Sequence, residues 1–411
     1  MTEQPVRRLP VDEVAPVLDA ARSAGLWHDE SRAVVFHDLA RMEADLDRLH
    51  AGFPADTLHS VAIKANPVVR LLAAVVDRGA GLEAASWEEV ELARAAGCAP
   101  DRIVFDSPAK TDAELRAAAE LGLWINADHE DELRRLEAIG VPAGTQVGLR
   151  VNPGSGAGSI GFTSTVSADS KFGVPLEQAA DLVARYPFVR GLHVHTGSQG
   201  VALELIDAAV NATCDAAAAL DLDWVDVGGG LPVRYTDADP EPPTLDDWTA
   251  MLSRTTAWGS RRLVTELGRW IQAGRGWLVS RIEAVKDVNG VRTMVVHAGA
   301  DMFLRRVYQP GSWDHEMVVL DSHGNPKAGP AEPTTVAGPL CFSGDLLAVE
   351  RPLTLAERGD LLLIRDVGAY TLAMWSRHCS RGLPPVVGHR GTEVVELFAG
   401  EDPGDVVAFW S

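Results

Sequence analysis

Lys64 follows the short apolar run Val61-Ala62-Ile63 and stands just before Asn66-Pro67. Proline cannot continue the hydrogen-bond ladder of a strand, so the run is expected to end here and to present the lysine at its end. Partial desolvation lowers the pKa of a lysine and makes its amine a nucleophile for an aldehyde. A solvated lysine at a strand end is the alternative, and the rest of the chain decides between the two.

Other residues suited to chemistry also follow predicted strands. Together with the lysine they are, in chain order, Lys64, Glu83, Arg150, His195, the triplet Gly228-Gly229-Gly230 and Glu266. In a barrel of parallel strands the carboxyl ends of the strands share one face, and active sites are built on that face. Chance would not readily place so many at strand ends, so we expect a catalytic site there.

The triplet Gly228-Gly229-Gly230 exposes backbone N–H groups without side-chain obstruction, which favours a phosphate site. A tight turn explains three glycines equally well. Ser198 follows His193 and His195 and could donate a further hydrogen bond to the same phosphate. One of the two histidines is suited to stack on a flat ring.

Glu266 adds a carboxylate after the last predicted strand of this region. Opposite a pyridine nitrogen it would keep that nitrogen protonated and make the ring an electron sink. The structural alternative is a salt bridge to Arg262 or Arg269.

Cys341 lies in Gly338–Asp345, a segment rich in turn residues. Buried cysteines are usually inert, but a loop position with Asp345 nearby favours a thiol that transfers protons. Tyr370, after Gly368-Ala369, offers a phenol that could also reach a phosphate.

Short apolar runs alternate with helix-period segments from about residue 60 to 270. The expected strands are Val61–Asn66, Gly81–Ser86, Ile103–Pro108, Leu123–Asp128, Gln146–Val151, Val189–Ser198, Trp224–Gly230 and Leu263–Gly268. The expected helices are Trp87–Gly97, Thr111–Gly122, Glu130–Gly140, Leu176–Tyr186 and Ala202–Leu220. This alternation indicates a parallel sheet with right-handed crossovers. About eight such units predict a (β/α)8 barrel, with an open doubly wound sheet as the alternative.

The pattern changes after Ile271. Asn289-Gly290, between two apolar runs, predicts a β-hairpin because both residues tolerate positive φ. Further β-like runs follow at Met317–Leu320, Leu361–Arg365, Glu393–Leu397 and Val406–Phe409. We therefore expect an antiparallel, β-barrel-like domain built from residues 274–411 and 1–30, and a barrel domain spanning residues 31–273.

Composition narrows the class of protein. The 411 residues are 46% hydrophobic and 23% charged, as in a soluble globular protein, and the formal net charge is −21. Such a charge makes nucleic acid and anionic membranes unlikely partners. The N-terminus lacks the apolar core of a signal peptide, which favours a cytoplasmic location. The four cysteines form no CxxC pair, so neither a disulfide framework nor a metal site is expected.

The ordered motifs resemble those of the fold-type III pyridoxal-phosphate (PLP) decarboxylases, the family of diaminopimelate, ornithine and arginine decarboxylases. The resemblance covers nearly the whole chain. It rests on Ala62–Pro67, Glu83–Ser86, Arg150–Pro153, Ser170–Gly173, His195–Ser198, Gly228–Gly230, Glu266–Arg269, Gly338–Cys341 and Gly368–Tyr370.

The resemblance implies a PLP-binding barrel, a C-terminal β-domain and a homodimer with shared active sites. Lys64 would link covalently to PLP, His195 would stack on its ring and Glu266 would pair with its pyridine nitrogen. Glu83 and Arg150 would organise the lysine side of the site. The expected phosphate ligands are Ser198, Gly228, Gly229, Gly230, Gly268, Arg269 and Tyr370. Cys341, from the partner subunit, would return a proton after carbon dioxide leaves.

The substrate positions depart from those of the enzymes that this chain resembles. Related enzymes follow the cysteine with an acidic residue that recognises a distal amine, whereas this chain has Phe342. Losing that charge-assisted hydrogen bond costs about 1.5–3 kcal/mol, and a cation–π contact returns about 0.5–1 kcal/mol. Asp345 is the one nearby carboxylate that could replace it. Arg305 and His378 favour a substrate side chain with a polar or anionic end.

We therefore expect an amino-acid decarboxylase for a non-standard amino acid of specialised metabolism. A PLP-dependent racemase or epimerase is one alternative, although a cysteine in the proton-donor loop fits decarboxylation better. A non-catalytic homologue that binds a regulatory partner is the other, and Lys64 together with Cys341 argues against it.

Overall fold

The structure, a computed structural model, describes residues 9–28, 30–159, 164–255, 259, 261–311 and 313–411. Residues 1–8, on which the absence of a signal peptide was argued, lie outside this part. The described chain divides into two compact units. One unit comprises Glu43–Val233 and Glu241–Ile271, and the other comprises the residues up to Met42, Arg234–Pro240 and Gln272–Ser411.

Eight described strands of the first unit run parallel and close into a barrel, because the last strand, β10, pairs with the first, β2. They are β2 (Leu58–Ala62), β3 (Gly81–Ala84), β4 (Ile103–Phe105), β5 (Trp124–Ala127), β6 (Gln146–Asn152), β8 (Val189–His193), β9 (Trp224–Asp226) and β10 (Arg262–Thr265). The short strand β7 (Val174–Pro175) pairs with β6 outside this ring. The predicted (β/α)8 barrel is confirmed, and the doubly wound alternative is wrong.

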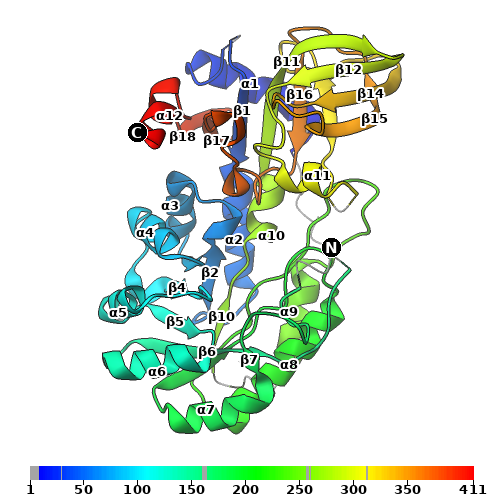
Figure 1. Ribbon diagram of the computed structural model, residues 1–411. Coiled ribbons are helices and arrows are strands. Elements are labelled where there is room, and N and C mark those ends of the chain that lie inside the picture. Colours follow the sequence, from blue (N-terminus) through cyan, green and yellow to red (C-terminus); the bar gives the residue numbers. More distant parts are fainter. Residues whose placement is uncertain (1–8, 29, 160–163, 256–258, 260, 312) are drawn as a thin grey trace. The chain divides into compact units, whose positions relative to one another are not determined.

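Helices alternate with these strands along the chain, as Figure 1 shows. They are α2 (Leu39–Ala51), α3 (Val69–Asp77), α4 (Trp87–Ala95), α5 (Asp112–Leu121), α6 (Glu130–Ile139), α7 (Ala179–Arg185), α8 (Leu203–Ala219), α9 (Leu245–Arg254) and α10 (Arg269–Gln272). Helix α5 shows why the helices begin where they do. Thr111 accepts a hydrogen bond from the Glu114 N–H while the Glu114 side chain accepts one from the Thr111 N–H, a reciprocal capping box.

Large side chains fill the barrel. Trp124 and Trp224 meet edge to face with ring centroids 4.9 Å apart, within a buried cluster that also contains Leu58, Val104 and Val264. Trp224 takes so much room that a Cβ on Gly191 of the neighbouring strand would lie 2.1 Å from its ring. The interior is therefore packed rather than open.

The predicted barrel strands start close to where the real strands start, but all except Gln146–Val151 run too far. Strand β2 ends at Ala62, and Lys64 lies in the 3-10 turn η2 (Ile63–Ala65) that follows it. His195 and Glu266 likewise lie beyond the ends of β8 and β10. Lys64, His195 and Glu266 are thus carried by the turns and loops that follow the strands, whereas Glu83 and Arg150 lie within β3 and β6.

The second unit is built on a mostly antiparallel sheet. Its strands are β1 (Ala33–Asp38), β11 (Gly276–Val288), β12 (Val291–Val296), β13 (Met317–Leu320), β14 (Ala331–Ala337), β15 (Leu346–Thr354), β16 (Leu361–Arg365), β17 (Val386–Arg390) and β18 (Glu393–Phe398). Asn289 and Gly290 join β11 to β12 with φ values of 55° and 81°, which confirms the predicted hairpin. Three helices complete the unit: α1 (Val14–Ser23), α11 (Leu304–Tyr308) and α12 (Pro403–Trp410).

The N-terminal segment belongs to this second unit. Strand β1 pairs with β11 and β17 (Figure 1), and Phe36 stacks on Trp277 with ring centroids 4.1 Å apart. Val14 and Leu18 of α1 are buried in the same core. The segment contributed to this unit is therefore longer than residues 1–30, because β1 completes its sheet.

One predicted strand is a helix. The run Val406–Phe409 lies in α12, where Asp402 caps the N-terminus, Pro403 occupies the first turn and Asp405 completes a capping box. These capping signals outweigh the β propensity of a short apolar run.

Among the described residues, no helix is both long enough and apolar enough to cross a lipid bilayer.

Candidate active site

Lys64 forms an ion pair inside the barrel unit. Its Nζ lies 2.5 Å from Oε2 of Glu83, which has no exposed surface, while the Lys64 side chain is 34% exposed. Burial raises the pKa of Glu83 well above its usual value, and the charge of Lys64 only partly offsets this. A carboxylate with a raised pKa can take a proton from the ammonium and leave a neutral, nucleophilic amine.

Asp106, which follows β4, brings a second buried carboxylate toward this pair. Burial opposes its ionisation, but the charges of Lys64 and Arg150 and a hydrogen bond with Glu83 outweigh that effect, and the pKa of Asp106 is lowered. The pKa of Glu83 is therefore raised and the pKa of Asp106 is lowered, and such a separation of pKa values is typical of acid–base sites.

Arg150 at the end of β6 is nearly buried, and two carboxylates hold it. Its Nη1 lies 3.8 Å from Asp106 and its Nε 3.9 Å from Asp128. The Phe172 ring covers the guanidinium at 4.3 Å, and the Gly173 N–H donates to Asp128. The segment Ser170–Gly173 thus folds over the arginine and fixes its direction.

Glu266 lies beside two histidines. Its Oε2 is 3.5 Å from His193 Nε2 and 3.8 Å from His195 Nδ1. Burial opposes ionisation of Glu266, but His193 outweighs it, so the pKa of Glu266 is lowered. Burial alone would lower the pKa of His193. The negative charges of Glu266 and Asp226 outweigh the effect of burial, so the pKa of His193 is raised. Both shifts favour an imidazolium on His193 beside a carboxylate on Glu266.

His195 has a fixed proton arrangement. Its Nδ1 accepts a hydrogen bond from the Gly229 N–H at 3.1 Å, so in the neutral ring Nε2 carries the proton. Burial, reinforced by the charge of Lys64, lowers the pKa of His195 to about 3. The ring is therefore neutral near pH 7.

The glycine triplet is required by close packing. A Cβ on Gly229 would lie 2.4 Å from the Glu266 carbonyl oxygen, and Gly228 and Gly230 have φ values of 65° and 111°. Two of the three N–H groups are used within the barrel, because Gly228 donates to Asp226 and Gly229 to His195. We expected all three N–H groups to face a phosphate. Since those of Gly228 and Gly229 already donate elsewhere, the Gly230 N–H is the one that could donate to a phosphate.

Two further predicted phosphate ligands meet. Arg269 Nε donates to Ser198 Oγ at 2.9 Å, and Arg269 is 3% exposed. Gly268 lets the loop after β10 pass close to the turn that carries Lys64. A Cβ on Gly268 would lie 2.9 Å from the Ala62 Cβ and 3.0 Å from the Ala65 Cβ. The loops after β8 and β10 therefore converge next to the turn that carries Lys64.

The remaining predicted site residues belong to the second unit. Arg305 stacks between Trp313 and Tyr370, with its guanidinium 4.9 Å and 5.1 Å from the two ring centroids. Phe342 stacks on Tyr308 at 5.9 Å and meets the edge of His378 at 5.8 Å. The residue after the cysteine thus lies within an aromatic cluster.

Asp345 has a role other than the predicted one. Its Oδ1 accepts the Ala300 N–H at 2.6 Å and its Oδ2 accepts the Leu340 N–H at 2.7 Å. The residue is only 2% exposed. Its carboxylate anchors the loop that carries Cys341, so we no longer assign it to a substrate amine.

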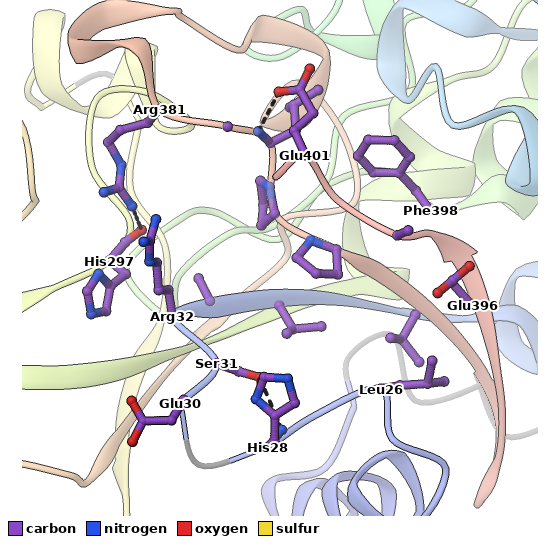
Figure 2. Close-up of a pocket in the computed structure, with 18 of the residues that line it drawn as sticks. Leu26, His28, Glu30, Ser31, Arg32, His297, Arg381, Glu396, Phe398 and Glu401 are labelled. Carbon is purple, nitrogen blue, oxygen red and sulfur yellow. Dashed lines mark hydrogen bonds between the residues drawn. The ribbon is translucent and has the colours of Figure 1, made fainter. Parts of the chain in front are cut away.

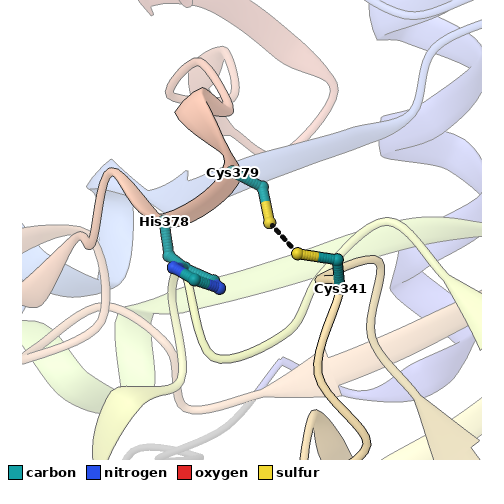
Figure 3. Close-up of side chains that lie close together, drawn as sticks. All are labelled: Cys341, His378 and Cys379. Atoms are coloured by element: carbon teal, nitrogen blue, oxygen red, sulfur yellow. Dashed lines mark hydrogen bonds between the residues drawn. The ribbon is translucent and has the colours of Figure 1, made fainter.

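Cys341 has a neighbour that the sequence did not reveal. Its Sγ lies 3.1 Å from Sγ of Cys379, and both residues are exposed (Figure 3). The hydrogen bond with Cys379 raises the pKa of the Cys341 thiol. A thiol with a raised pKa keeps its proton near neutral pH and can donate it.

A pocket of about 370 Å³ also lies in the second unit (Figure 2). Arg32, His297 and Arg381 lie together on one side of it, and Phe398 and Leu26 line another part. None of the predicted site residues lines this pocket. It is therefore separate from the chemistry described above.

Sequence reasoning missed Asp106 and Asp226 as site residues, and it offered His193 only as one of two histidines suited to stack on a ring. Each is buried and ends or follows a barrel strand. Their position at the end of an apolar strand could have identified them. A charged residue is costly to bury without a partner, so one found there is expected to have a specific role.

The barrel residues fit pyridoxal phosphate. Both carboxylate oxygens of Glu266 are buried without a hydrogen-bond partner among the described residues, so a protonated pyridine nitrogen would supply one. Lys64 offers the amine for the aldehyde. Arg269 and Ser198 offer the donors that a phosphate requires.

Comparison with known proteins agrees with this chemistry. The family described as "Pyridoxal-dependent decarboxylase, pyridoxal binding domain" matches residues 39–273. The diaminopimelate decarboxylase of Deinococcus radiodurans is 34% identical over 377 residues, 90% of this chain and 94% of that protein. That of Zymomonas mobilis is 32% identical over 342 residues, 80% of this chain and 79% of that protein.

A solved structure gives the same result. Diaminopimelate decarboxylase from Helicobacter pylori, complexed with L-lysine, superposes with a TM-score of 0.85 at 25% identity, covering 95% of this chain and 98% of that one. The chain therefore belongs to the pyridoxal-dependent decarboxylases. It is a PLP-dependent amino-acid carboxy-lyase related to diaminopimelate decarboxylase, which confirms the predicted family, cofactor and enzyme class.

Proposed function

We propose that the enzyme removes the α-carboxylate of a non-standard amino acid whose side chain ends in a polar or anionic group. The observation that carries the proposal is Phe342. It occupies the position where related enzymes place an acidic residue, and it packs between Tyr308 and His378. The nearest alternative carboxylate, Asp345, is buried and accepts two backbone N–H groups. A substrate ammonium would find no exposed carboxylate in the loop Gly338–Asp345.

Arg305 supports the same substrate class. Its guanidinium lies over two aromatic rings, an arrangement that orients a planar cation toward a carboxylate. Arg377, the neighbour of His378, donates two hydrogen bonds of 2.6 Å to Glu401. We therefore assign the anionic end of the substrate to Arg305 and His378 rather than to Arg377.

The barrel residues receive the following roles. Lys64 holds the cofactor, and Glu83 accepts the proton that its amine must lose. When bound, pyridoxal phosphate would supply an electron sink for the electron pair that the broken C–C bond leaves on the α-carbon. Glu266 keeps the pyridine nitrogen protonated, and His195 provides the neutral stacking surface.

Cofactor anchoring and the final proton transfer complete the assignment. Ser198, Gly230 and Arg269, together with Tyr370, hold the phosphate. Cys341 donates a proton to the α-carbon after decarboxylation. Its exposure in the single chain suits a residue that acts in the active site of a partner subunit, so we propose a homodimer with shared active sites. We place this enzyme in the cytoplasm.

Decarboxylation of diaminopimelate is the second candidate function. The relatives named above support it, since they carry that name at 32% and 34% identity. Phe342 is the residue that separates the two candidates.

The test measures carbon dioxide release from diaminopimelate, lysine and ornithine, and from amino acids with carboxylate or amide ends, free and carrier-bound. Wild type is expected to turn over a member of the second group at least tenfold faster. Phe342→Glu is expected to reverse that preference, and Phe342→Leu serves as the matched uncharged control. Efficient turnover of diaminopimelate, lysine or ornithine by wild type would reject the proposed substrate class.

A further inference from the structure

Two thiols and an imidazole come together in the second unit. Figure 3 shows Cys379 and His378 on one turn and Cys341 on a facing loop, with the two sulfur atoms directed at one another. The ligand atoms of all three residues lie within 4.8 Å of one another, and all three residues are exposed. Thiolate and imidazole are the ligands that zinc prefers.

The loop that carries Cys341 is fixed from inside. The buried Asp345 carboxylate accepts N–H groups from Leu340 and from Ala300, at 2.7 Å and 2.6 Å. Gly338 packs so closely that a Cβ there would lie 2.2 Å from Asp345 Oδ2. The position of Cys341 is therefore tied to the segment around Ala300.

The turn that carries His378 and Cys379 is tied to the same segment. The Ser376 N–H donates to the Asp301 carbonyl oxygen at 2.9 Å, and Arg381 Nε donates to the buried Asp301 carboxylate at 2.9 Å. Cys379 itself has φ 58°, a conformation that non-glycine residues adopt at an energetic cost. Ala300 and Asp301 thus hold both ligand-bearing segments in register.

We propose that Cys341, His378 and Cys379 form a binding site for a divalent cation of zinc-like softness. Three protein ligands leave a fourth tetrahedral position for water or a substrate group. Zn–S bonds of about 2.3 Å place two thiolates about 3.8 Å apart, so the sulfur atoms, now 3.1 Å apart, need to separate by less than about 1 Å. The cation displaces one proton from each thiol to solvent and changes no oxidation state.

A cation bound at this site would also affect catalysis, and this consequence rests on the proposed function. A thiolate held by a metal cannot give a proton to the α-carbon, so the cation would inhibit decarboxylation reversibly. Binding itself does not depend on that function. A spectroscopic test of binding therefore separates failure of this site from failure of the proposed reaction.

The experiment titrates Co²⁺ into the untagged, cofactor-loaded enzyme after reduction of its thiols, and then displaces it with Zn²⁺. One tetrahedral site per chain with thiolate-to-cobalt absorption is expected, and Zn²⁺ should abolish the signal. Cys379→Ser and His378→Ala should each weaken binding roughly a hundredfold or more, since even outer-shell changes cost 10- to 100-fold. The control is Cys98→Ala, which removes a buried thiol elsewhere and should bind as wild type does.

Two results would overturn the site. The first is the absence of thiolate–cobalt absorption in reduced wild type. This result counts against the site whether or not the two cysteines form a disulfide before reduction. The second is unchanged affinity in Cys379→Ser. Thermal unfolding of each variant checks that lost binding does not reflect a lost fold.

Discussion

At the scale of single residues, the chemistry begins with Lys64 and Glu83. An ammonium 2.5 Å from a fully buried carboxylate is stabilised as a pair, yet burial raises the pKa of Glu83. Burial thus favours the protonated form of Glu83, so this carboxylate can accept the proton that the Lys64 amine must lose. We infer that Glu83 makes the lysine amine available each time that the cofactor exchanges partners.

Glu83→Gln tests this inference. Glutamine keeps the shape and one hydrogen-bond acceptor but cannot take the proton, so kcat/KM should fall roughly a hundredfold or more. The matched control is Glu132→Gln, which breaks another buried pair, with Lys110 at 3.0 Å. The control should lower the melting temperature and leave kcat/KM within a few-fold of wild type. Equal loss of activity in both variants would show that Glu83 has only a structural role.

At the scale of elements, the loops that follow the barrel strands position the side chains of the candidate site relative to one another. The loop after β10 passes so close to η2 that Gly268 has no room for a side chain. This contact couples Arg269, the proposed phosphate ligand, to the turn that carries Lys64. A small displacement of one should therefore misplace the other.

Gly268→Ala is expected to reduce kcat/KM roughly tenfold to a hundredfold, because displacements near 1 Å have effects of that size. Gly52→Ala is the control, since its Cβ would meet no atom closer than 3.4 Å. Cofactor absorbance and steady-state kinetics give the comparison. Wild-type kinetics in Gly268→Ala would mean that the two loops are not coupled.

The sequence predicted the barrel, and placed the candidate site at its strand ends, for a physical reason. Alternating apolar runs specify parallel strands, and polar residues at their ends must gather on one face. It predicted strand ends poorly, because apolar residues such as Val194 and Leu267 stay buried beyond the ends of β8 and β10. Nor could it predict the Cys341–Cys379 pair, whose members lie 38 residues apart on separate loops.

At the scale of the whole molecule, the proposed homodimer shares its active sites. Lys64 and Cys341 belong to different units of the chain, and each proposed site takes them from different subunits. Two inactive variants should therefore complement one another. A mixture of Lys64→Ala and Cys341→Ala subunits contains one intact site in each mixed dimer.

Refolding or co-expression of equal amounts of these variants should restore about a quarter of wild-type activity, as random pairing of two subunit types in a C2 dimer requires. Each variant alone is the control and should be nearly inactive. A mixture no more active than its components, in a sample whose mass shows mixed dimers, would contradict shared sites.

The central claim is that Lys64 holds pyridoxal phosphate in the barrel of this decarboxylase. The most direct measurement is the visible spectrum of the purified enzyme before and after borohydride reduction, followed by mass mapping of the reduced adduct. A yellow band that disappears on reduction, with a pyridoxyl group on Lys64, is the predicted result. A pyridoxyl group on another lysine, or a colourless protein that cannot be reconstituted with pyridoxal phosphate, would contradict it.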